Sequence, residues 1–103
     1  MMKVEVRFAK DEEGARIGEL AAACPWASCD WSRVEPYWLV ATADDEIVAA
    51  IQALVAVPIG RIDFLLVDPE LSHRNRARVV KRITDYAVAV LSAGGAQYVA
   101  SAI

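Results

Sequence analysis

A run of basic residues near the middle of the chain, in the segment SHRNRARVVKR, is the first candidate for chemistry. Its members are Arg74, Arg76, Arg78, Lys81 and Arg82, with His73 directly before them. The segment follows a Pro turn and precedes an apolar stretch with helical spacing, so it should begin a helix. Free backbone N–H groups and the dipole at a helix N-terminus attract anions, and Arg binds phosphate through two parallel hydrogen bonds. The pattern therefore predicts a site for phosphate groups.

The alternative interpretation is a solvated helix face whose cations pair with Asp68, Glu70 and Asp85. Exposed cations near a helix N-terminus oppose its dipole, at a cost of about 0.3–1 kcal/mol each, so a face built only for solubility would carry them elsewhere. Both interpretations stay open on the sequence. We do not expect nucleic acid as a partner, because a formal net charge of -3 with one basic patch gives no broad positive field.

A carboxylate and a phenol are the candidates for proton transfer. Asp63 lies in the strand-like run RIDFLLV, where alternation places it on one face with Leu65 and Val67, opposite the face that carries Ile62, Phe64 and Leu66. It could act as a general base, or it could be a solvent-facing carboxylate paired with Arg61 or Arg7. Tyr98, near the C-terminus, could donate a proton or could belong to the core or to an interface.

The two cysteines do not indicate a metal site. Cys24 and Cys29 stand in CPWASCD without the second pair of ligands that zinc would need, and two thiols are too few for a disulfide framework. We expect two half-buried thiols beside a Pro turn and no metal.

The elements that must position these residues belong to one globular domain over residues 1–103, because the chain is short and 56% hydrophobic. No apolar run approaches the roughly 20 residues of a membrane span, and charges occupy the N-terminal segment where a signal peptide would be apolar. We therefore expect a cytoplasmic protein with no membrane partner.

Alternation in KVEVRFA predicts a strand with Val4, Val6 and Phe8 on one face. Asp11 should cap a helix that carries Ile17, Leu20 and Ala21 on one face and ends before Pro25. The next two strand-like runs, within YWLVATADDEIVAAIQALVAV, are separated by a hairpin turn at residues 43–45. Pro58 and Gly60 mark another turn before RIDFLLV.

A long amphipathic helix should begin at Ala77. Its apolar face comprises Val80, Ile83, Ala87, Val90 and Leu91, with Val79 and Tyr86 on the flank, and Gly94 and Gly95 follow its end. AQYVASAI would be a final strand. The predicted fold class is α/β, with a mixed, mainly antiparallel sheet, flanking helices, and a parallel final pair of strands across a right-handed crossover.

This order of elements, with VDPE between a strand and a basic helix start, resembles the GCN5-related N-acetyltransferase (GNAT) superfamily. In that family a loop of pattern R/Q-x-x-G-x-G/A holds the pyrophosphate of acyl-CoA. The resemblance places the loop at Ser72, His73, Arg74, Asn75, Arg76 and Ala77, followed by Arg78. It implies that the backbone of Leu65, Leu66 and Val67 pairs with the pantetheine arm of acetyl-CoA.

Two features depart from the family pattern. Ser72 replaces the leading Arg or Gln, and Asn75 replaces the first Gly, which narrows the approach of a phosphate to the backbone. The chain also ends before the family's last helix and strands, so the resemblance covers nearly all of the sequence but about two-thirds of the family domain.

The resemblance implies transfer of an acyl group from acyl-CoA to an unknown amine, with Asp63 as the base, at a position where many relatives carry a Glu. The Tyr that often acts as the acid in the family belongs to the part that this chain lacks, so Tyr98 is a candidate acid on its residue type alone. Trp26, Trp31 and Trp38 could line an acceptor pocket or pack against the first helix. The alternative is a non-catalytic binding or assembly module of the same fold, of the kind that a phage or mobile element would carry. An uncharged terminal strand with an open edge predicts a homodimer in either case.

Overall fold

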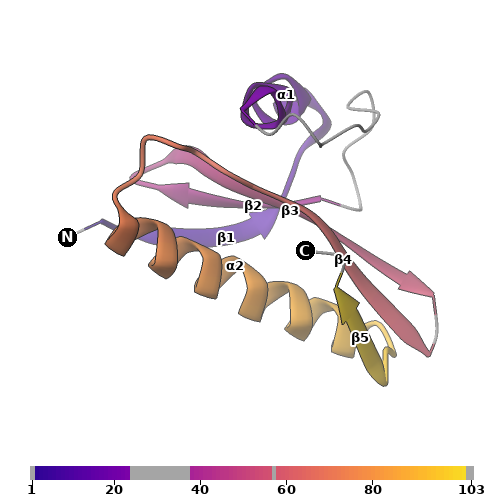
Figure 1. Cartoon of the computed structure of the whole chain (residues 1–103). Coiled ribbons are helices and arrows are strands. Elements are labelled where there is room, and N and C mark those ends of the chain that lie inside the picture. The colour runs from indigo at the N-terminus through magenta and orange to yellow at the C-terminus, as the bar shows by residue number, and fades with distance from the viewer. Residues whose placement is uncertain (1, 24–37, 57, 102–103) are drawn as a thin grey trace.

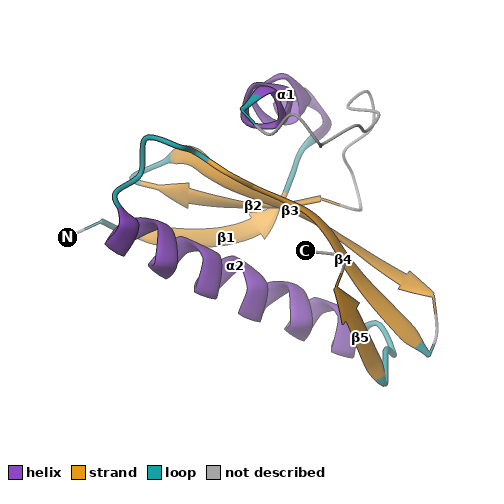
Figure 2. Ribbon diagram, in the orientation of Figure 1, coloured by secondary structure: helices purple, strands orange, loops and turns teal. Residues whose placement is uncertain are grey.

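The chain forms a five-stranded mixed sheet with one helix on each face, as predicted (Figures 1 and 2). The computed structural model describes residues 2–23, 38–56 and 58–101. Its elements are, in order, β1 (Val4–Phe8), the 3-10 helix η1 (Asp11–Glu13), α1 (Gly14–Ala22), β2 (Trp38–Ala43), β3 (Glu46–Ala56), β4 (Ile59–Val67), α2 (His73–Ala93) and β5 (Tyr98–Ser101). The strands lie in the order of the sequence; β1 to β4 are antiparallel and β5 is parallel to β4.

Each face of the sheet has its own apolar core. The α2 side buries four residues of the helix, Val79, Ile83, Ala87 and Leu91, against the centre of the sheet. The α1 side is smaller and buries Ile17, Leu20 and Ala21. Val79, predicted on the flank of α2, is thus a core residue, because the buried stripe follows a spacing of four from residue 79.

The start of α1 differs from the predicted cap. Asp11 lies inside η1, whose N-cap is Lys10, and α1 follows directly with Glu13 at its own N-cap position. The Glu13 side chain reaches back to accept a hydrogen bond from the Lys10 amide at 2.8 Å. The prediction that Asp11 caps the helix was wrong, because the carboxylate three residues beyond the cap satisfies that backbone donor instead. Cys24, Cys29, Trp26, Trp31 and the stop at Pro25 lie outside the described residues.

The first predicted turn is confirmed and the second needs correction. Asp44 and Asp45 adopt positive φ angles of 51° and 71°, which suits a two-residue hairpin between β2 and β3. Pro58 does lie in the turn before β4, but Gly60 is a buried residue within that strand. A Cβ added at Gly60 would meet Leu91 at 3.0 Å and Ala96 at 3.1 Å. Gly60 therefore permits the close approach of α2, not a turn.

β4 contains a bulge. Ala50 pairs with Leu66, whereas Gln52 pairs with Asp63, so two residues of β4 oppose Ile51 alone. An extra residue of this kind bends the strand and re-aims the side chains beyond it.

The bulge changes the predicted faces of β4. Ile62 belongs to the core under α2, together with the partly buried Leu65 and Val67, while Leu66 belongs to the core under α1. The prediction that Ile62 lies opposite Leu65 and Val67 was therefore wrong. Strict alternation fails because the face of the strand switches at residues 63–65.

Within the ranges that the structure describes, no helix is long and apolar enough to cross a membrane. In the same ranges, no three His, Cys, Asp or Glu residues gather as a metal site would require.

Candidate functional site

α2 begins at His73, four residues earlier than predicted. The predicted phosphate-binding loop at residues 72–77 is therefore the N-cap and first turn of the helix. Ser72 is the N-cap, and its hydroxyl accepts a hydrogen bond from the Asn75 amide at 3.2 Å. The first intrahelical bond runs from the Arg76 amide to the Ser72 carbonyl at 2.8 Å. In the described part of the chain, the amides of His73 and Arg74 make no hydrogen bond, so two helix donors remain for an anion.

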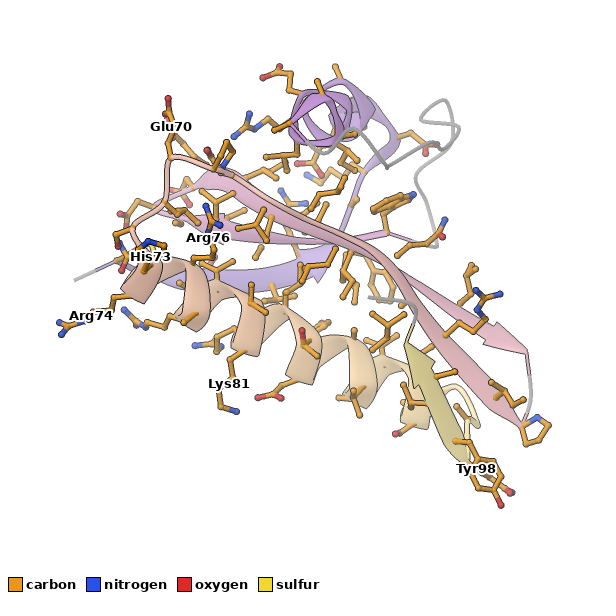
Figure 3. The ribbon with its side chains drawn as sticks, viewed as in Figure 1. Glu70, His73, Arg74, Arg76, Lys81 and Tyr98 are labelled. Carbon is orange, nitrogen blue, oxygen red and sulfur yellow. The ribbon has the colours of Figure 1, made fainter. Side chains whose placement is uncertain are left out.

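The cations of this turn have few acidic partners. Arg76 is half-buried and donates through Nη2 to the Pro69 carbonyl at 3.3 Å, while its buried Nε has no partner among the described residues. Lys81 pairs with Asp85 at 2.7 Å. Arg74 extends into solvent at the start of α2 (Figure 3). Of the three acids expected to neutralise the basic face, only Asp85 does so, which favours the anion-binding interpretation.

Among the described residues, the edge of β4 away from β3 has no partner along its second half. β5 pairs with β4 only from Ile59 to Ile62, through Tyr98 to Ser101. In the described part of the chain, no strand lies beside Leu65, Leu66 and Val67 on that edge. An open run of backbone groups therefore leads from the bulge toward the start of α2 (Figure 1).

The two candidate proton-transfer residues lie on β4 and β5. Asp63 stands at the bulge, at the first backbone position beyond the β5 pairing, and its side chain lies outside those described. Tyr98 is 67% exposed and pairs with Ile59, at the opposite end of β4 from Val67 (Figure 3). Eight residues separate Ile59 from Val67, about 26 Å along a strand. The structure thus brings Asp63 to the open edge and does not bring Tyr98 to the start of α2.

Trp38 is part of the core and not of a pocket. It is 1% exposed and packs in the cluster under α1. The interpretation of this residue as packing is confirmed.

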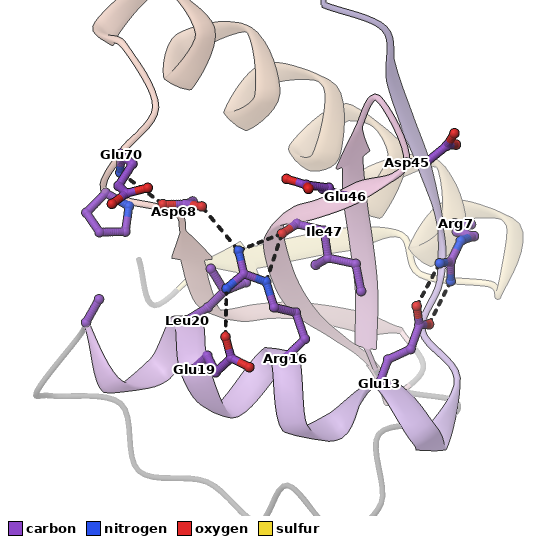
Figure 4. Close-up of a pocket in the computed structure, with 12 residues that line it drawn as sticks. Arg7, Glu13, Arg16, Glu19, Leu20, Asp45, Glu46, Ile47, Asp68 and Glu70 are labelled. Atoms are coloured by element: carbon purple, nitrogen blue, oxygen red, sulfur yellow. Dashed lines mark hydrogen bonds and ion pairs between the residues drawn. The ribbon is translucent and has the colours of Figure 1, made fainter.

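A groove of about 760 Å³ lies beside α1, where β1, β3 and β4 meet the helix (Figure 4). Most of its lining residues are charged, and acids outnumber bases. They are Arg7, Glu13, Arg16, Glu19, Leu20, Ala23, Asp45, Glu46, Ile47, Asp68, Pro69 and Glu70.

The Arg7–Glu13 ion pair lies at one end of this groove. Arg7 donates from Nη1 and Nη2 to the two carboxylate oxygens of Glu13, at 2.8 and 2.7 Å. These hydrogen bonds, with that from the Lys10 amide, lower the pKa of Glu13 to about 2 against an opposing desolvation. The same hydrogen bonds raise the pKa of Arg7.

A second charged contact, at the other end of the groove, links α1 to the turn before α2. Arg16 donates from Nη2 to Asp68 Oδ2 at 3.1 Å and, from Nε and Nη2, to the Ile47 carbonyl at 3.1 and 2.9 Å (Figure 4). The other oxygen of Asp68 accepts from the Glu70 amide at 2.9 Å. Sequence reasoning missed Arg16, because 52 residues separate it from Asp68 and no local pattern connects them.

The sequence matches no protein-family model and no curated protein. Solved structures are similar in fold. Diaminobutyrate acetyltransferase from Paenibacillus lautus, in complex with its substrate and coenzyme A, superposes with a TM-score of 0.81 at 12% identity, over 100% of this chain and 67% of that one. The aminoglycoside N-acetyltransferase AAC(6')-Iy in complex with CoA superposes with a TM-score of 0.75 at 14% identity, over 100% of this chain and 78% of the other.

The chain has the GNAT fold. A Mycobacterium tuberculosis protein in complex with CoA is a third similar structure, with a TM-score of 0.77 at 19% identity over 94% of this chain. The chain spans 63% to 78% of the length of these three proteins. Identities this low establish the GNAT fold alone and not the activity or the ligands.

Proposed function

We propose that the chain binds acyl-CoA and acts as a GNAT-like N-acyltransferase. The observation that carries the proposal is the continuity of two features. The open edge of β4 beyond Ile62 leads directly to a helix N-terminus that is rich in Arg and has free amides. That several structures of this fold contain CoA supports the choice of ligand.

The open edge suits the pantetheine arm. Its two amide groups can hydrogen-bond to the backbone of Leu65, Leu66 and Val67 as a neighbouring strand would. The bulge at residues 63–65 bends β4 where the arm would end, which leaves space for the thioester.

The start of α2 suits the pyrophosphate. The free amides of His73 and Arg74 supply donors, and the helix dipole favours negative charge. Arg74, Arg76 and Arg78 surround this turn. Asn75 and Ala77 lie within the same turn, and because the Asn75 amide is already bonded to Ser72, the amides of the two preceding residues are the ones available.

The reaction is a direct acyl transfer. The nitrogen of a neutral amine attacks the thioester carbonyl carbon, the C–S bond breaks, and the CoA thiolate leaves. The proton lost by the amine passes to a base, for which Asp63 is the candidate at the open edge. A backbone N–H of the bulged part of β4 would stabilise the negative oxygen of the tetrahedral intermediate.

Calorimetric titration of CoA and acetyl-CoA into the purified chain tests the binding step. We expect a micromolar dissociation constant for the wild type and an increase of roughly tenfold for Arg74→Glu, because the variant reverses a charge beside the pyrophosphate. Arg74 has no partner in the described part of the chain, so its replacement should leave folding intact.

Lys81→Glu is the matched control, since it makes the same change of charge about 10 Å further along α2, near the Debye length at physiological salt. If both variants raised the dissociation constant for CoA equally, the start of α2 would not be the pyrophosphate site. The absence of heat at millimolar ligand would contradict acyl-CoA binding altogether.

Release of free thiol from acetyl-CoA in the presence of amines tests the chemical step. Asp63→Asn should lower the rate by about 100-fold while CoA binding is retained, as expected for loss of a general base. Binding without any thiol release would leave the second candidate function, a non-catalytic module of the GNAT fold that self-associates through β5. The uncharged, exposed edge of β5 favours that candidate.

A further inference from the structure

Arg16 connects three parts of the molecule that are distant in sequence. Its guanidinium donates to the Ile47 carbonyl on β3, to Asp68 after β4, and from Nη1 to Glu19 on its own helix at 3.1 Å. The Arg16 side chain is 34% exposed and that of Asp68 is 22% exposed. This ion pair is therefore better shielded from water than the Arg16–Glu19 pair on α1 or the Lys81–Asp85 pair on α2.

Asp68 stabilises the turn at residues 68–71, which connects β4 to α2. Its amide donates to the Val48 carbonyl at 2.8 Å, its Oδ1 accepts from the Glu70 amide, and its carbonyl accepts from the Leu71 amide at 3.3 Å. The next residue is the N-cap Ser72. The direction in which the first turn of α2 leaves the sheet therefore depends on how Asp68 is held.

The turn is fixed from two sides. On the α2 side, Arg76 donates to the Pro69 carbonyl. On the α1 side, Arg16 holds the remaining carboxylate oxygen of Asp68. An Arg is suited to this place because its planar group reaches a carbonyl and a carboxylate at once, which a single ammonium group does not.

We infer that Arg16 is a positioning residue for the anion site: through Asp68 it sets the first turn of α2 relative to the open edge of β4. This inference rests on the proposed binding of acyl-CoA. A ligand that contacts both the β4 edge and the α2 start needs the two at a fixed separation, so a loosened turn should weaken binding even though Arg16 touches no part of the ligand.

The test compares Arg16→Met with Arg7→Met. Each variant removes an Arg–carboxylate pair of the same groove and keeps the apolar stem. Arg7, however, makes no hydrogen bond or ion pair with the turn at residues 68–71 in the described structure. We expect Arg16→Met to raise the dissociation constant for CoA about fivefold and Arg7→Met to leave it within about a factor of two, at similar losses of stability.

Two further measurements separate positioning from general destabilisation. In the ligand-free protein, the amides of Glu70 and Leu71 should exchange hydrogen faster in Arg16→Met than in Arg7→Met, because both donate to Asp68. In a double-mutant cycle, Asp68→Asn should add little to the effect of Arg16→Met on the dissociation constant, because the two act as one unit.

Unchanged CoA binding by Arg16→Met, additive effects in the cycle, or unchanged exchange at Glu70 and Leu71 would each overturn the inference while leaving the proposed function in place. Failure of the wild type to bind CoA would overturn both.

Discussion

At the scale of single residues, the charge of Glu13 is fully paired, because both carboxylate oxygens accept hydrogen bonds. Its two oxygens accept hydrogen bonds from Arg7, and one of them also accepts from the Lys10 amide. The pair anchors the junction of β1 and α1, and it lies away from the start of α2. It should therefore contribute to stability and not to ligand binding.

The stability contribution of Glu13 should depend on pH. Because folding lowers the pKa of Glu13 from 4.5 to about 2, the contribution is present above pH 4.5 and is lost as the pH falls toward 2. Glu13→Gln should reduce the free energy of unfolding at pH 7 by about 1–2 kcal/mol, less than the full shift would give because the Arg7 side chain is 42% exposed.

Urea unfolding of both proteins between pH 2 and pH 7 measures this contribution. The difference between wild type and variant should shrink through the window from pH 4.5 to pH 2. Glu12→Gln, at the exposed neighbouring position, is the control and should change the free energy by less than about 0.5 kcal/mol. A constant difference across the pH range would show that Glu13 acts by packing instead of charge.

The residue types in the sequence predicted one part of the candidate site, the basic start of α2, and not the rest. The cluster of Arg residues at a helix start could be predicted from the sequence. Cations there interact unfavourably with the helix dipole, which indicates that an anion binds between them. The link between Arg16 and Asp68 was not visible, because its geometry exists only once α1 lies over the sheet. The groove beside α1 was missed for the same reason, since its lining comes from four separate segments.

At the scale of elements, hydrophobic periodicity predicted every strand and both helices that the structure describes, and the errors concern boundaries and faces. α2 begins before its apolar stripe because Ser72 caps a polar first turn. β4 switches faces because a bulge, which leaves no mark in an apolar run, interrupts its alternation. The sequence predicts a turn at Gly60 because a glycine required for packing looks the same in sequence as a glycine required for backbone freedom.

The role of Gly60 can be tested against Gly18, which has open space around it. Gly60→Ala should destabilise the protein by about 1–3 kcal/mol, because the added Cβ would lie 3.0 Å from the buried Leu91 Cβ. Gly18→Ala should stabilise it by about 0.5–1 kcal/mol, because the position is inside α1 and an added Cβ would meet nothing within 4 Å outside the local helix backbone.

Thermal or urea unfolding of the two variants provides the comparison. Opposite signs are expected from the same chemical change. A neutral Gly60→Ala would mean that α2 moves away from β4 at little cost, and the contact would then not fix the distance between the helix and the β4 edge.

At the scale of the whole molecule, the two edges of the sheet differ in charge. β1 exposes Glu5, which pairs with Lys3 at 3.2 Å, and it also carries Arg7. Residues 86–103, which include β5, contain no charged side chain, and Tyr98 and Val99 are 67% and 41% exposed. Charged edges resist pairing with another sheet, whereas uncharged apolar edges favour it. If two copies associate, the expected contact is therefore β5.

We expect the chain to dimerise through β5. The molar mass from light scattering should rise with concentration for the wild type, and Tyr98→Lys should abolish the rise because it places a charge on the edge of each copy. Tyr98 is exposed, so the change should cost little stability in the monomer. Phe8→Lys, at an exposed apolar position on β1, is the matched control and should leave the association unchanged. Equal loss of association in both variants would assign the contact to general surface hydrophobicity, and a monomer at every concentration would mean that the β5 edge does not pair with a second copy.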